Sequence, residues 1–345
     1  MLPYVVKRLV WAVVVFVAVT FSTYIIFFIV PTNRPRVVQG RDITTGITQS
    51  TGIHGSVGRQ YGEFLWRIVR GHSLGRSTTS REDVNDLLRR AAPITGSLIL
   101  GGAVFWLLLS IPIGILSAVR SRSLLDRAAM VFVLIGISAH PIWLGLILSY
   151  VFTWKLHLFP AGGYCDFFYA PRSASCGGPV QWAYHLVLPW ITFGCLFAAL
   201  YVRMIRANVR ETLDLDYVTT ARAKGASEWR VLRSHVLRNA FLPVVTMLGM
   251  DMSIAFGGSV FVESVFGLPG IGGLAVRSLQ RQDLPPLMGI IVVVTIAILI
   301  FNLVVDLLYA WLDPRVGHVP RSIDEEDAAP LRRHGAEAQA RPLPQ

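Results

Sequence analysis

The stretch DYVTTARAKGASEWRVLRSHVLRNAFLP, residues 216–243, is a charged island between two apolar segments that are each long enough to cross a membrane. Asp216 can accept hydrogen bonds from free backbone N–H groups, which predicts a short helix over residues 217–224. Gly225 suits the left-handed conformation that ends a helix without a Cβ penalty. The first half of the stretch is therefore predicted to be a capped helix that stops at a glycine corner.

The second half predicts another short helix, over residues 228–238, with Ser227 as its cap. Its apolar positions, Val231 and Val236 among them, fall on one face. Helices this short are marginal alone, so we expect both to lean on a partner. Small residues keep the corner narrow enough for another backbone to approach closely, and they are Ala221, Ala223, Gly225 and Ala226. The pattern indicates a docking surface.

Composition places the chain among membrane proteins. Hydrophobic residues make up 53% and charged residues 15% of the sequence, whereas soluble domains carry about 25% charged residues. The net charge of +11 comes from basic residues that flank apolar spans, and no nucleic-acid-reading motif accompanies them, which argues against a nucleic-acid partner.

Six apolar segments are long enough to be membrane spans. They are Leu9–Val30, Ile94–Val119, Ala128–Trp154, Leu186–Val202, Ala240–Val262 and Leu287–Leu312. The short loops at 119–127 and 203–239 carry three and eight Lys or Arg residues, whereas those at 154–185 and 263–286 carry two each. By the positive-inside rule both termini are cytoplasmic. The 31–93 segment carries ten arginines, which would favour the opposite orientation. It is too long for the positive-inside rule to apply strongly, so the short loops decide.

Polar residues in unusual places are the candidate functional groups. Asp251 lies in the middle of the fifth span, where an aspartate costs about 2.5–3.5 kcal/mol, so it must face protein or a water-filled path. His140 lies at the centre of the third span and either lines a pathway or bonds a neighbouring helix. For Asp251, structural pairing and pathway lining both stay open. Cys165 and Cys176 share one outer loop, as a disulfide or as two free thiols.

Chemistry that an ATP-binding chain needs is absent. No Gly-Lys pair occurs, so a Walker-type phosphate loop is excluded. No His-Glu-x-x-His occurs, and the eight histidines show no metal-type spacing. We expect a chain that is not an enzyme and that holds neither a metal nor a cofactor. If it is driven by ATP, another chain binds the nucleotide.

The stretch 216–243 resembles the cytoplasmic loop of permease subunits in bacterial ABC importers, in particular those of the dipeptide, oligopeptide and nickel class. The general signature is Glu-Ala-Ala, three further residues and then Gly. It is only partly kept, because Thr219, Thr220 and Ala221 stand at its first three positions. The run Asp-Tyr-Val and then Thr-Ala-Arg-Ala-Lys-Gly, ending at Gly225, is that of the peptide class. Two further motifs agree, at residues 266–272 (FGLPGIG) and 302–315, and the resemblance covers about residues 1–316.

The resemblance implies an all-α membrane protein with the type I ABC importer permease fold. It would have six transmembrane helices, cytoplasmic termini and a coupling helix between helices 4 and 5. The implied division is a first anchor at 1–30, an extracytoplasmic loop region at 31–93, a five-helix permease core at 94–315 and a disordered cytoplasmic tail at 316–345. The coupling loop, 203–239, would dock in a cleft of the ATPase through Thr219, Thr220, Ala221, Arg222, Ala223, Lys224, Gly225, Ala226, Glu228 and Trp229.

The implied function is translocation of di- or oligopeptides into the cytoplasm of a bacterium, across its inner membrane. The partners would be a second six-helix permease subunit, two ABC ATPase subunits or domains that hold ATP and Mg²⁺, an extracytoplasmic binding protein and the lipid bilayer. Nickel or another small solute is the alternative cargo. An ion-coupled carrier is a rival class, which would need a repeated pattern of ionisable residues near the midplane.

Overall fold

The computed structural model describes residues 2–29, 37–38, 41–42, 57–71, 73–168 and 176–312. Apart from one hairpin, the regular elements in these ranges are helices. In that hairpin β1 (Val37–Val38) pairs antiparallel with β2 (Arg41–Asp42), with Val37 opposite Asp42. The predicted disordered tail, 316–345, lies outside the described residues.

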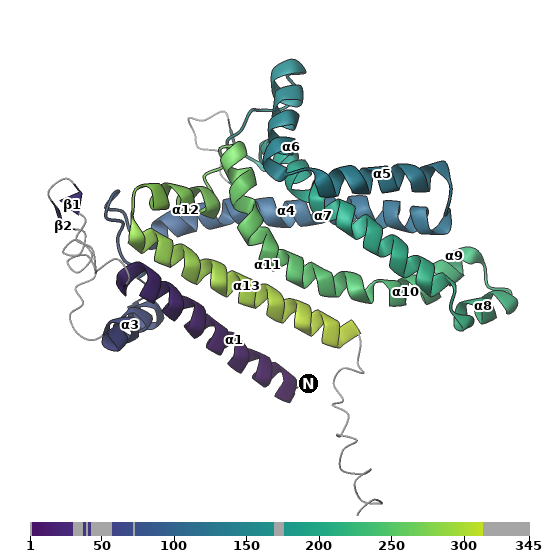
Figure 1. Cartoon of the computed structure of the whole chain (residues 1–345), viewed down its shortest axis with the longest axis horizontal. Helices are drawn as coiled ribbons and strands as arrows, with labels where there is room; N and C mark the ends of the chain where they lie inside the picture. Colours follow the sequence, from purple (N-terminus) through teal and green to yellow (C-terminus); the bar gives the residue numbers. More distant parts are fainter. Residues whose placement is uncertain are drawn as a thin grey trace, which may run out of the picture.

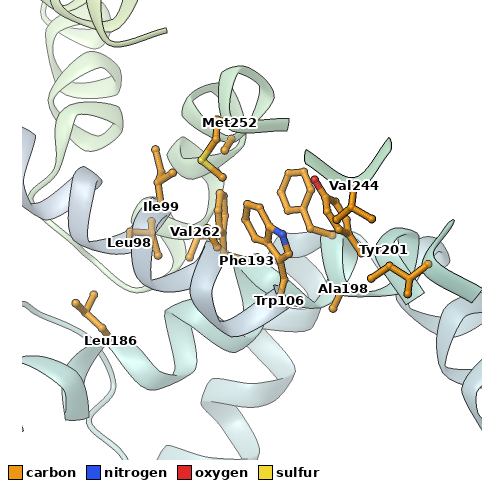
Figure 2. Packing of buried hydrophobic residues seen from close by; sticks show 14 of the residues in the cluster. Leu98, Ile99, Trp106, Leu186, Phe193, Ala198, Tyr201, Val244, Met252 and Val262 are labelled. Carbon is orange, nitrogen blue, oxygen red and sulfur yellow. The ribbon is translucent and has the colours of Figure 1, made fainter. Parts of the chain in front are cut away.

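Two long helices form the centre of the bundle, α4 (Val84–Val119) and α7 (Pro179–Leu213). Both extend beyond the spans predicted from hydropathy, because polar turns continue each helix outside its apolar window. Aromatic side chains fill the contact: the Trp106 ring stacks on Phe197 with centroids 4.6 Å apart. Met252 and Val262 of α11 (Leu242–Val265) belong to the same buried cluster (Figure 2).

The third predicted span is broken. The expected continuous helix over Ala128–Trp154 is instead α5 (Leu124–Ser138) followed by α6 (Pro141–Leu148), which continues as a π-helix over Ser149–Lys155, with a bend of 108° between α5 and the second half. Proline lacks an N–H group and restricts the residue before it, so a helix ends readily there. Hydropathy alone cannot register this break, because both halves are apolar.

Other helices complete the bundle. The N-terminal α1 (Leu2–Tyr24) packs on α13 (Leu284–Leu312), and Arg8 of α1 pairs with Asp306 of α13 at 3.0 Å. On α3 (Val57–Trp66), the Tyr61 hydroxyl lies 2.8 Å from Thr20 Oγ1 of α1. Among the described residues, five helices are long and apolar enough to cross a membrane, and the bent pair makes up to six.

Short helices lie at both ends of the bundle (Figure 1). Two short helices, α8 (Asp216–Ala223) and α9 (Glu228–Arg230), lie at one end of the bundle, and α12 (Ile271–Gln280) lies at the other. The first helix begins and α13 ends toward the α8 end. The two arginine-rich segments, 119–127 and 203–239, also lie toward that end.

Candidate functional site

The corner at Gly225 forms as the sequence predicts. Gly225 has a φ of 81°, in the left-handed region, and its N–H donates to the Arg222 carbonyl at 2.9 Å. The caps differ from expectation: α8 begins one residue early, after Leu215, and the Ser227 side chain makes no capping bond.

The second helix of the corner is also less regular than predicted. The α-helix α9 passes into a π-helix over Val231–Val236 and then into α10 (Leu237–Ala240). The predicted apolar face is nevertheless buried, with Val231 and Val236 fully covered.

The inner side of this corner is fixed to the bundle. Val218 of α8 is fully buried together with Val231 and Val236, in the same cluster as the α4–α7 core. The Tyr217 hydroxyl accepts a hydrogen bond from Asn239 Nδ2 at 2.8 Å, which ties α8 to α10. The two short helices are therefore held by burial rather than by their own propensity.

The outer side is open to solvent. We call it the elbow surface, and its exposed members are Thr219, Thr220, Arg222, Ala223, Lys224, Gly225, Glu228 and Trp229. Trp229 is 68% exposed, and tryptophan is a residue type that is enriched at protein interfaces. Arg222 clamps the corner by two bonds to Glu228, at 2.9 and 3.3 Å.

Two of the small residues are only partly exposed. Ala221 and Ala226 are half-buried and pack against the core cluster, and the Ala226 N–H donates to the Ala221 carbonyl at 3.2 Å. Their size lets the two helices close on each other. Only Ala223 and Gly225 keep the exposed side narrow, and a Cβ on Gly225 would meet no atom within 4 Å.

A charged network lies on the bundle at the elbow end. Asp126 of α5 is buried and accepts two bonds from Arg206 of α7, at 2.6 Å from Nε and 2.9 Å from Nη2. It also accepts from Ser117 Oγ of α4 at 2.5 Å and from the Arg122 N–H at 2.9 Å. One carboxylate thus joins three helices. Sequence reasoning missed this network, and its only signal was an acidic residue inside a loop with three arginines.

The candidate pathway residues occupy different environments. Asp251 of α11 is 6% exposed and interacts with the Tyr201 hydroxyl of α7. Within the described residues, neither Asp251 Oδ2 nor that hydroxyl has a partner at standard hydrogen-bond geometry. His140 is exposed and caps α6, because its Nδ1 accepts from the Ile142 N–H at 3.3 Å. His140 thus caps α6 at an exposed position, whereas Asp251 lies inside the bundle beside the Tyr201 hydroxyl.

At the opposite end, the glycine-rich segment 267–273 wraps a buried carboxylate. Glu263 is 1% exposed, and it accepts from Thr95 Oγ1 at 2.6 Å and from the Gly273 N–H at 2.9 Å. Thr95 Oγ1 in turn accepts from the Ile271 N–H at 2.8 Å. A Cβ on Gly270 would lie 2.5 Å from the Glu263 carboxyl carbon. The glycines therefore make room for the carboxylate.

The outer loop that precedes α7 is cross-linked. Cys165 and Cys176 form a disulfide with a Cα–Cα separation of 5.4 Å. The sequence had left open a disulfide or two free thiols, and the structure has the disulfide.

A hydrolase-type Gly-x-Ser-x-Gly pattern does occur at residues 71–75. Such a pattern supports catalysis only on a sharp strand-to-helix turn. Here the first glycine of the pattern ends a π-helix, Arg67–Gly71, and Ser73 Oγ accepts a local bond from the Gly75 N–H at 3.3 Å. The structural context is therefore not that of a nucleophile.

Comparison with known proteins agrees with this architecture. Residues 110–318 match the family model described as "Binding-protein-dependent transport system inner membrane component", and residues 1–99 match the model of its N-terminal region. The chain belongs to this family. It is the inner-membrane permease component of a binding-protein-dependent ABC transporter, a system in which ATPase and binding-protein partners are implied and ATP hydrolysis does not lie on the permease.

Several relatives match over nearly their full length. The probable D,D-dipeptide transport system permease protein DdpB of Escherichia coli K12 is 35% identical, over 89% of this chain and 95% of the relative. The dipeptide transport system permease protein DppB of the same organism is 30% identical, over 92% and 99%. A putative peptide permease of Brucella suis is 34% identical, over 92% and 99%. An inward-facing structure of the MetNI methionine ABC transporter shares the fold, with a TM-score of 0.51 and 17% identity over 66% of this chain and 96% of that one.

Proposed function

We propose that this permease carries di- or oligopeptides inward and is driven through the elbow surface by ABC ATPase subunits. The observation that carries the second part is the division of residues 216–240 into a buried inner side and an exposed outer side that includes Trp229. A solvated connector would not need Val218, Val231 and Val236 to be fully buried beneath it. Burial on that side makes the corner a rigid part of α7 and α11.

The elbow surface is linked to the bundle helices by short connections in the chain. Two residues separate α7 from α8, and one residue separates α10 from α11. Force applied to the elbow surface therefore acts on two helices of the bundle directly, and it acts on α4 and α5 through the Asp126–Arg206 network. We infer that ATP-driven closure of the partner ATPases moves these helices and switches the pathway between its two openings.

The orientation and the remaining partners belong to the same proposal. Arginines of the loops 119–127 and 203–239 lie at the elbow end, which supports a cytoplasmic elbow and cytoplasmic termini. A second six-helix permease subunit would complete the pathway, and Asp251 would line it or pair across it. The names of the curated relatives support a peptide cargo.

Loss of the Trp229 ring tests the docking role. Trp229→Ala should lower the affinity of the permease for the ATPase subunits by at least about 30-fold, because aromatic anchors at interfaces contribute about 2 kcal/mol or more. The loss should be visible as reduced copurification of the ATPase subunits. Trp154→Ala is the matched control, since Trp154 is also 68% exposed but lies at the far end of the broken span. Equal ATPase recovery with wild type and Trp229→Ala would contradict the docking role.

The cargo is tested separately with the wild-type transporter. Uptake of a labelled dipeptide should require both ATP and this chain, and excess unlabelled di- or tripeptides should compete with it. Competition by Ni²⁺ and not by peptides would reject the peptide cargo while leaving the docking role intact.

A further inference from the structure

Three ligand-type side chains meet in the outer loop, away from the elbow surface. The Sγ atoms of Cys165 and Cys176 and a ring nitrogen of His185 all lie within 4.8 Å of one another. Cys165 is 1% exposed, and the other two residues are half-buried. The loop before α7 supplies the cysteines, and the second turn of α7 supplies the histidine. Transport as proposed above makes no use of this cluster.

The histidine is oriented by its neighbour on the helix. His185 Nδ1 lies 2.9 Å from the Gln181 carbonyl oxygen, which can only accept a hydrogen bond. Nδ1 must therefore carry the proton, and the lone pair is on Nε2. Cys165 Sγ lies 3.3 Å from Nδ1 and 3.7 Å from Nε2, beside the ring. Metal-binding histidines are commonly held in this way, with the second ring nitrogen donating to a backbone carbonyl.

The spacing fits a tetrahedral metal ion once the disulfide is open. With metal–sulfur and metal–nitrogen bonds of about 2.3 and 2.1 Å, sulfur and nitrogen ligands lie about 3.6 Å apart and two sulfurs about 3.8 Å apart. The Cys165 Sγ–His185 Nε2 distance of 3.7 Å already agrees. The two sulfurs need to separate, which the half-buried Cys176 can do while the buried Cys165 side chain remains in place. The imidazole of His185 must also turn, because Cys165 Sγ now lies closer to Nδ1 than to Nε2.

We propose that Cys165, Cys176 and His185 form a redox-gated site for a thiophilic divalent cation such as Zn²⁺. A dithiol reductant opens the disulfide: its two thiols become a disulfide, and the two electrons and two protons yield the Cys165 and Cys176 thiols. Zn²⁺ then binds as both thiol protons leave to solvent, with His185 Nε2 as the third ligand. Water takes the fourth position, as in sites with three protein ligands. The disulfide and the metal-bound form exclude each other.

The test compares oxidised and reduced samples of the full-length chain in lipid nanodiscs. One sample is reduced with a phosphine and desalted without oxygen, and both are titrated with Zn²⁺ against a chromophoric chelator. Reduced protein should bind one equivalent more than oxidised protein. His185→Ala should weaken that binding by at least about 100-fold, since even second-shell losses cost 10–100-fold. Cys195→Ser, which removes the free cysteine within α7, should bind as wild type does.

Two results would overturn the site: equal Zn²⁺ binding before and after reduction, or unchanged affinity in His185→Ala. If His185→Ala does not fold, His185→Gln and the wild-type comparison of the two redox states decide the question. None of these readouts depends on ATPase docking or peptide uptake.

Discussion

The Asp126–Arg206 pair gives the sharpest energetic prediction. Asp126→Asn removes a negative charge that accepts four hydrogen bonds from Arg206, Ser117 and Arg122. Breaking one side of a buried ion pair costs about 3–5 kcal/mol. The Arg206 side chain keeps 23% of its surface exposed, so water can partly solvate it. We therefore expect Asp126→Asn to lower the free energy of unfolding by about 3 kcal/mol, the lower limit of that range.

The assay is equilibrium unfolding of the purified permease in mixed micelles, followed by tryptophan fluorescence. A double-mutant cycle with Arg206→Gln should show a coupling free energy of about 1.5 kcal/mol or more, because an Asn–Gln pair leaves no unpaired charge. Glu82→Gln is the control: Glu82 pairs with Arg90 at 3.0 Å, but both side chains are largely exposed, so the cost should stay below about 1 kcal/mol. Additive effects of the two single changes would refute the reasoning.

Three further substitutions probe the packing and a buried hydrogen bond. Gly249→Ala places a Cβ 2.6 Å from Val305 and should destabilise the protein by about 1–3 kcal/mol, whereas Gly257→Ala in the same helix meets nothing within 4 Å and should be nearly neutral in the same unfolding assay. Thr95→Val leaves the buried Glu263 carboxylate without its hydroxyl donor and should cost about 1–3 kcal/mol, with faster hydrogen exchange in the segment 267–273; unchanged exchange there would contradict the role of this bond.

The elbow was predictable because its signals are local. A glycine after a short capped segment predicted the corner, and the apolar positions Val231 and Val236 predicted its buried face. The π-helical turn at Val231–Val236 was not predictable, since no side chain in it distinguishes a π from an α turn. The half-buried positions of Ala221 and Ala226 were not predictable, because small size fits close packing inside a corner as well as outside it.

Long-range contacts could not be predicted from the chain alone. Asp126 and Arg206 are 80 residues apart, and each reads as an ordinary charge near a span end. Asp283 and Ser77 are 206 residues apart and are joined by a 2.5 Å hydrogen bond. His140 read as a mid-span residue because hydropathy averages over the break that His140 and Pro141 create.

Site-specific photo-cross-linking from the elbow surface tests the central claim most directly. A benzophenone side chain at Ala223, which is exposed beside Gly225, should form an adduct with the ATP-binding subunit in the purified transporter, and the same group at Trp154 should not. Adducts with the ATPase from position 154, or none from position 223 in a complex that hydrolyses ATP, would contradict the account.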